Sequence, residues 1–266
     1  MIKPSLKILV PLLVSAIAAM FLLRECSTQV RDNTRGFNPG NGDTINVAIE
    51  YSPLSLYRYD DTLGGFNYDM LRLVLAREGM KLKFYPVASL DWALDGLENG
   101  KFDIVVADIP VTSGFKEKYR FTEPVHLDRQ ILVSNDTTVH SQLDLARKTV
   151  YVPSGSPAAD RLRNLSHEIG DTIYVVEDSG YGAEQLFMLT AAGEIQLAVV
   201  NRATAVRLAA DYPDTDISTP ISFTQFQSWV MSRDSTARAD SIDAAITRFK
   251  NTQEYRTLLR RYGIGE

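Results

Sequence analysis

The chain has 266 residues, of which 45% are apolar, which suits one or two globular domains with a buried core. Its net charge of −5 argues against nucleic-acid binding, which normally requires a basic face. A single cysteine excludes an intramolecular disulfide and a multi-cysteine zinc site, and the three histidines show no pair at metal-ligand spacing. We therefore expect no metal and no cofactor.

The first 26 residues have the pattern of an export segment. Residues 1–7 are short and basic, and residues 8–23 follow without a charge. This run is short for a membrane span, which takes about 20 apolar residues. Cys26 comes just after the run, preceded by Arg24 and Glu25. Two interpretations stay open: residues 1–26 form an uncleaved membrane anchor, or Cys26 is acylated as in a lipoprotein.

Residues 27–43 are polar and rich in Gly, Asn and Asp, which predicts a flexible tether. Beyond residue 26 the chain holds 25 basic and 32 acidic residues, a net charge of −7. We expect this acidic part to work outside the cytoplasm, in the periplasm, held to the membrane through the N-terminal segment.

Strand and helix patterns alternate from residue 44 onward. Residues 45–51 (INVAIEY) alternate apolar and polar side chains, which predicts a strand. Residues 68–78 carry an apolar stripe at helical spacing. Further elements are predicted as a strand at 82–86, a helix at 90–98 and a strand at 104–107. Such an order with short connections predicts a parallel sheet covered on both faces, with ligands beyond the carboxyl ends of its strands.

The same alternation then starts again. Strands are predicted at residues 130–134, 149–152, 172–176, 197–200 and 227–231, and helices at 157–167 (with Pro157 as first residue), 183–192, 235–250 and 253–262. Two α/β units of this kind predict two lobes with a cleft between them. We assign residues 44–132 and 223–266 to the first lobe and residues 133–222 to the second.

Three motifs in order carry a family resemblance: GFNYDM at residues 65–70, LENGKFDI at 97–104 and FTEP at 121–124. Together they resemble extracellular solute-binding proteins of family 3, the periplasmic amino-acid-binding type, from about residue 45 to residue 263. Within that family the chain looks most like the solute-binding-like module of membrane-bound lytic transglycosylase F. The resemblance implies a two-lobed type II periplasmic-binding-protein fold that closes on a ligand by hinge motion.

The resemblance also implies positions for the ligand contacts. In the segment of residues 107–116, Phe115 stands where an Arg usually holds the ligand carboxylate. Asp108 and Pro110 stand where the family often offers small polar donors, and Thr112 of the same segment is a further candidate contact. Lys116 is an alternative cation, although helix geometry turns it about 100° away from Phe115. Asn201 replaces the Asp that usually holds the ligand ammonium. Each lost charge-assisted bond costs about 1.5–3 kcal/mol, so we expect the ligand not to be a standard amino-acid zwitterion.

Other candidate residues follow from the same comparison. Ser154, Gly155 and Ser156 form a turn that opens a helix, where free N–H groups take an anion or a serine simply caps the helix. Tyr51 matches an aromatic residue that relatives place against the ligand, and its alternative is a rim or core tyrosine. We expect Trp92 and Trp229 to lie in the core.

No nucleophile elbow, P-loop or dinucleotide motif occurs in the chain, so we expect a binding protein and not an enzyme. Our first interpretation is a membrane-tethered extracytoplasmic solute-binding protein for transport or sensing, with a membrane permease as partner. The alternative is a cell-wall or signalling adaptor that uses a degenerate binding module. The third interpretation is a degenerate transglycosylase-type enzyme, but no sequence motif indicates a catalytic Glu.

Overall fold

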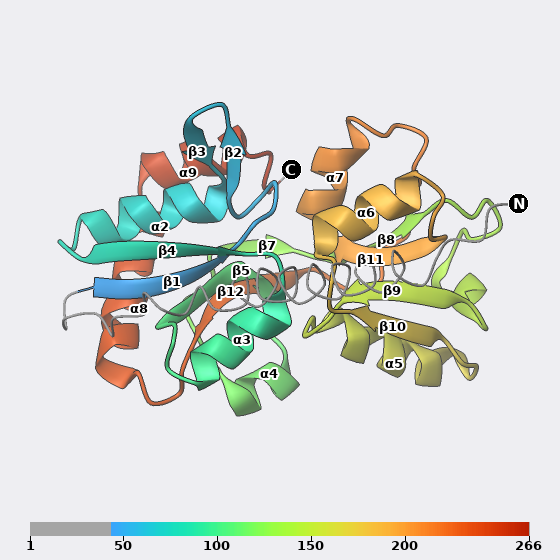
Figure 1. Ribbon diagram of the computed structural model, residues 1–266, viewed down its shortest axis with the longest axis horizontal. Helices are drawn as coiled ribbons and strands as arrows, with labels where there is room; N and C mark the ends of the chain where they lie inside the picture. The colour runs from blue at the N-terminus through green and yellow to red at the C-terminus, as the bar shows by residue number, and fades with distance from the viewer. Residues whose placement is uncertain (1–43, 266) are drawn as a thin grey trace, which may run out of the picture. The chain divides into compact units, whose positions relative to one another are not determined.

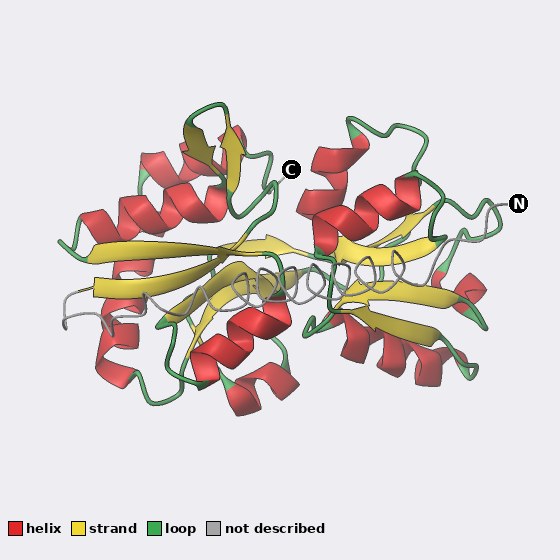
Figure 2. Ribbon diagram, viewed as in Figure 1, coloured by secondary structure: helices red, strands yellow, loops and turns green. Residues whose placement is uncertain are grey.

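Residues 44–265 form two large β-sheets with helices packed on both faces, and a separate two-stranded hairpin, in the computed structural model of the chain (Figure 1; Figure 2). The expected anchor at residues 1–26, the tether at 27–43 and Cys26 lie outside the residues that the structure describes. Within residues 44–265, no helix has the length and apolar character needed to cross a bilayer.

The first sheet contains three parallel strands, two short strands that follow them, and one strand that returns from late in the chain. Its order is β4-β1-β5-β12-β6, and β7 also pairs with β12. The strands are β1 (Thr44–Glu50), β4 (Lys81–Val87), β5 (Ile104–Pro110), β6 (Arg120–Phe121), β7 (His126–Asp128) and β12 (Gln225–Met231). β1 is parallel to β4 and β5, whereas β12 is antiparallel to β5, β6 and β7.

Alternating side chains of β1 supply two separate cores. Val47 and Ile49 are buried in one cluster with residues of α2 (Phe66–Ala76), α8 (Thr236–Lys250) and α9 (Gln253–Arg261). Ala48 points to the other face, where α3 (Leu90–Glu98) and α4 (Ser113–Lys118) contribute. Figure 1 shows α2 and α3 on opposite sides of this sheet. The alternation is what a strand with both faces covered requires.

The second sheet repeats this arrangement in the order β10-β9-β11-β8. Its strands are β8 (Gln130–Ser134), β9 (Thr149–Pro153), β10 (Tyr174–Asp178) and β11 (Leu197–Asn201), and a 3₁₀ helix, η2, covers Gln142–Leu145. The cluster on one face includes α5 (Ala158–Ile169), and the cluster on the other includes α6 (Ala183–Ala191) and α7 (Arg202–Ala209). The two sheets with their covering helices form the two α/β lobes that the sequence predicted.

The chain passes between the sheets at two adjacent points. It leaves the first sheet after Asp128 and enters the second at Gln130, and it returns between Ile221 and Gln225. Gln130 ties the crossings together, since its N–H donates to Ser222 Oγ at 2.9 Å and its carbonyl accepts from the Ile221 N–H at 2.8 Å. We call residues 44–128 with 225–265 lobe one and residues 130–222 lobe two. The expected boundary after residue 132 falls inside β8.

Two local expectations are wrong. Trp92 is 47% exposed, because the core face of α3 consists of its neighbours Ala93, Leu94 and Leu97. Its ring packs on Phe102 instead. Pro157 precedes α5, which begins at Ala158. Trp229 is fully buried, which confirms its predicted place in the core.

The structure also contains short elements that the sequence pattern does not predict. These are the hairpin of β2 (Tyr57–Tyr59) and β3 (Thr62–Gly64), and α4, α7, β6, β7 and η2.

Candidate functional site

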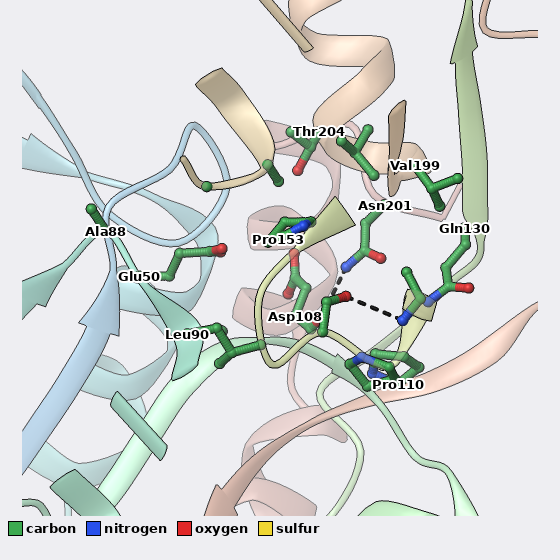
Figure 3. Close-up of a pocket in the computed structure, with 17 residues that line it drawn as sticks. Glu50, Ala88, Leu90, Asp108, Pro110, Gln130, Pro153, Val199, Asn201 and Thr204 are labelled. Carbon is green, nitrogen blue, oxygen red and sulfur yellow. Dashed lines mark hydrogen bonds between the residues drawn. The ribbon is translucent and has the colours of Figure 1, made fainter. Parts of the chain in front are cut away.

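A small pocket lies where strand ends from both lobes meet. β1 ends at Glu50, β5 at Pro110, β9 at Pro153 and β11 at Asn201, and all four residues line the pocket. The open space between them is about 40 Å³. Figure 3 shows Glu50 and Ala88 on one side of this interlobe pocket and Gln130 and Val199 on the other. Its position follows from the parallel strands, whose carboxyl ends share one edge of each sheet.

Asp108 is the centre of a buried hydrogen-bond network beside the pocket. Its Oδ1 accepts from His126 Nε2 at 2.9 Å and from Asn67 Nδ2 at 3.0 Å. Asn67 Nδ2 also donates to Ser55 Oγ, and its Oδ1 accepts from Trp229 Nε1 at 2.9 Å. A network with each member paired holds the Asp108 side chain in one position.

His126 is the ionisable side chain that pairs with Asp108. Burial alone would lower the pKa of His126, but the charge of Asp108 and the hydrogen bond between them raise it above its usual value. The two side chains are 1% and 5% exposed. His126 Nδ1 lies 3.2 Å from the Leu127 carbonyl, so both ring nitrogens face acceptors, as a protonated ring requires.

Glu50 is the second carboxylate of the pocket. Its Oε2 accepts long hydrogen bonds from Ser52 Oγ at 3.2 Å and Ser55 Oγ at 3.4 Å. Burial, followed by the charge of Asp108, raises the pKa of Glu50 to about 7, although the two serine hydroxyls oppose the shift. Glu184 on α6 adds a smaller repulsion. Glu50 therefore changes its charge near neutral pH.

Asn201 connects the lobes across the pocket. Its Nδ2 donates to the Asp108 carbonyl at 2.8 Å, which joins the end of β11 to β5 (Figure 3). A second approach occurs at Ser154, whose Oγ lies 3.4 Å from Asp91 Oδ2 on α3. The lobes are thus in contact at the pocket and beside it.

The structure brings together four of the residues predicted for the site: Asp108, Pro110, Ser156 and Asn201 all line the pocket. Ser156 Oγ also accepts from the N–H of Ala158, the first residue of α5, at 3.2 Å.

The other five predicted residues are not among those that line this pocket: Tyr51, Thr112, Phe115, Ser154 and Gly155. Thr112 Oγ1 caps α4 by accepting from the Phe115 N–H, and the Phe115 ring packs on Tyr119. Phe115 and Gly155 line a separate groove of about 350 Å³ beside α3. Tyr51 is 44% exposed.

Glu50 is the ionisable lining residue that sequence reasoning missed. It is the last residue of a strand that was predicted correctly, so its place at the strand end was a usable signal. None of the described residues that line the pocket is Lys or Arg. Within residues 44–265, no group of three or more His, Cys, Asp or Glu side chains is placed to hold a metal ion.

Comparison with known proteins agrees with this architecture. The profile of the family described as bacterial extracellular solute-binding proteins, family 3, matches residues 44–265. Membrane-bound lytic murein transglycosylase F of Aeromonas hydrophila is 26% identical over 206 residues, which are 77% of this chain and 41% of that protein. The amino-acid-binding protein AabA of Dichelobacter nodosus is 28% identical over 130 residues, 47% of this chain and 51% of that protein.

Solved structures share the fold at low sequence identity. An ancestral arginine-binding protein bound to arginine matches with a TM-score of 0.72 and 20% identity, over 83% of this chain and 98% of that chain. These matches confirm the resemblance drawn from the three sequence motifs. The chain spans about half, or less, of the length of the two curated relatives.

Proposed function

Because the chain belongs to family 3 of the bacterial extracellular solute-binding proteins, we propose that it captures a small solute between its lobes by hinge closure. One observation carries this proposal: strand ends from both lobes enclose one pocket, and Asn201 bonds across it to the Asp108 carbonyl. Closure of two domains around a ligand is a known way to bury it.

The pocket size supports a closed state of this hinge. An open space of about 40 Å³ is far below the roughly 300–1,000 Å³ of a pocket for a drug-sized ligand. A larger ligand enters only when the lobes separate at the two crossings near Gln130 and Ser222. We propose Asp108, Pro110, Ser156 and Asn201 as ligand contacts, while Tyr51, Thr112, Phe115, Ser154 and Gly155 stay predictions.

The setting of this binding is also a proposal. Residues 1–26 would hold the module at the membrane, through the apolar run or through acylated Cys26, and residues 27–43 would space it from the surface. The module would then work in the periplasm and deliver its solute to a permease or a sensor. The chain is proposed as a binding module and not as an enzyme.

A second candidate function is an adaptor that reports on the cell wall without transport. The similarity to a membrane-bound lytic murein transglycosylase over 77% of this chain favours it, since a related module is part of a protein named for murein. In this role a peptidoglycan-derived fragment or a protein partner, and not a nutrient, would engage the lobes.

A thermal-shift screen of the full chain in detergent tests the proposal. Amino acids, amino-acid amides, short peptides and muropeptides are added, and a ligand at a hundred times its dissociation constant is expected to add about 2.7 kcal/mol of stability. The test variant is Asn201→Ala, which removes the hydrogen bond across the pocket and is expected to reduce the ligand-induced rise in melting temperature. If no small molecule stabilises the chain, solute capture is wrong and the adaptor is favoured.

A further inference from the structure

We infer that the solute is a small amine without a carboxylate of its own, such as an amino-acid amide, and that Glu50 is the side chain that binds its ammonium group. This inference rests on the proposed function and names the class of ligand for the same pocket.

The first argument is the charge of the lining. Glu50 and Asp108 both line the pocket, and no described lining residue is Lys or Arg. Glu184, at the start of α6, adds a third negative charge close to Glu50. A ligand carboxylate in this space would face like charges and find no cationic side chain, so the pocket selects against zwitterions.

The second argument separates the two carboxylates. Asp108 already has a partner whose ring can carry a positive charge, because His126 Nε2 lies 2.9 Å from its Oδ1, and Asn67 donates to the same oxygen. Glu50 has no such partner among the residues that the structure describes, and both serine hydroxyls that reach it donate to Oε2. Its Oε1 is therefore available to a donor from the ligand.

The third argument is the energetic state of Glu50. A partly buried carboxylate without a cation is unfavourable, and an ammonium ion that reaches it forms a short, charge-assisted hydrogen bond. The ammonium group of the ligand thus supplies the positive charge that Glu50 lacks in the folded chain. Gln130, on the opposite side of the pocket in Figure 3, ends in a neutral carboxamide, which matches an uncharged polar group at the far end of the ligand.

Matched ligands that differ only in the carboxylate test the inference. Glycine, L-alanine and L-lysine are compared with glycinamide, L-alaninamide and L-lysinamide by calorimetry on the full chain at pH 8. We expect each amide to bind at least tenfold more tightly than its acid.

Glu50→Gln keeps the size of the side chain, removes its charge and is expected to weaken amide binding at least tenfold. The control, Asp61→Asn, removes an exposed carboxylate in the β2–β3 turn and is expected to leave binding unchanged.

Proton release provides a second measurement. The groups facing Glu50 are Asp108 on β5, with His126 behind it, and Glu184 on α6. An amine bound to Glu50 favours its charged form, so binding at pH 6.5 is expected to release a proton in the parent protein and none in Glu50→Gln. Titration in buffers of different ionisation enthalpy measures this release.

The outcomes separate the inference from the function on which it rests. Acids that bind as well as their amides, or amide binding that Glu50→Gln leaves intact, overturn the amine inference and leave solute capture standing. If no amide binds, the inference is also overturned, and the wider screen of peptides and muropeptides then decides whether solute capture falls with it.

Discussion

Glu50 links the folding equilibrium to pH through a single side chain. The folded chain keeps its proton up to about pH 7, whereas an ordinary glutamate in the unfolded chain releases it near pH 4.5. The folded state therefore binds more protons between these values, and its free energy of unfolding falls as the pH rises through this window. The contribution of Glu50 to the free energy of unfolding is therefore fully present below pH 4.5 and is lost above pH 7.

We expect Glu50→Gln to remove this dependence. Relative to the variant, the parent protein is expected to lose up to about 3 kcal/mol of unfolding free energy between pH 4.5 and pH 8. Urea unfolding of both proteins at pH 5 and pH 8 measures the difference, and other titrating groups such as His126 are common to both. Parallel pH profiles for the two proteins would contradict the assigned environment of Glu50.

For single residues, the prediction from sequence and the lining of the pocket differ by one position at the end of β1. It selected Tyr51, whereas the adjacent Glu50 lines the pocket. Neighbouring side chains of a strand point to opposite faces, so a shift of one residue exchanges what is inside and outside. The pair of Asp108 and His126 was not predictable either, because β5 and β7 meet only through β12, which lies about a hundred residues later.

Among the elements, α9 offers a direct measurement of helix capping. Thr252 precedes the helix, and its Oγ1 accepts from the Tyr255 N–H at 3.3 Å and donates to the Phe249 carbonyl at 2.7 Å. Thr257 lies within the same helix, and its Oγ1 donates back to the Gln253 carbonyl. Thr252 therefore caps the start of α9, whereas Thr257 bonds only within the helix.

We expect Thr252→Ala to destabilise the chain by about 1 kcal/mol, because the Tyr255 N–H loses its cap. Thr257→Ala is the matched control and is expected to change stability by less than about 0.5 kcal/mol, since alanine has the higher helix propensity. Urea unfolding with both variants measures the two effects. Equal losses in the two variants would show that Thr252 Oγ1 has no capping role.

Long amphipathic elements were predictable, and short ones were not. The helix at 90–98 matches α3 in both bounds, because an apolar stripe and Asn99-Gly100 mark it in sequence. The strands β2 and β3 have three residues each, and α4 has six, so none completes a readable period. α7 buries few apolar side chains, and its pattern of Arg, Ala and Thr gave no clear stripe.

In the molecule as a whole, two glycines let the lobes meet. A Cβ on Gly155 would lie 3.0 Å from the Asp91 Cα, and one on Gly182 would lie 3.0 Å from the Ala88 carbonyl oxygen. Both glycines belong to lobe two, and both neighbours belong to lobe one beside the pocket. Gly155 also has φ of +75°, so Gly182, with φ of −84°, isolates the steric effect.

We expect Gly182→Ala to hold the lobes slightly apart. Ligand affinity is expected to fall roughly threefold, about 0.7 kcal/mol, because each binding event must overcome the contact with Ala88. Gly114→Ala is the control, since a Cβ there meets nothing within 4 Å. Calorimetry with a ligand from the screen measures both, and small-angle scattering is expected to detect less closure in Gly182→Ala. Unchanged affinity would show that this approach does not limit closure.

The two adjacent crossings near Gln130 and Ser222 also set the order in which a nascent chain can fold. Lobe two is one continuous segment, so all its strands exist as soon as residue 222 leaves the ribosome. Lobe one waits for residues 225–231, because β12 inserts between β5 and β6. Until then β5 carries an unpaired edge, the kind of surface that invites wrong partners. The lobe that is synthesised first is therefore completed last, and the time between these events is when the newly made chain most needs protection from aggregation.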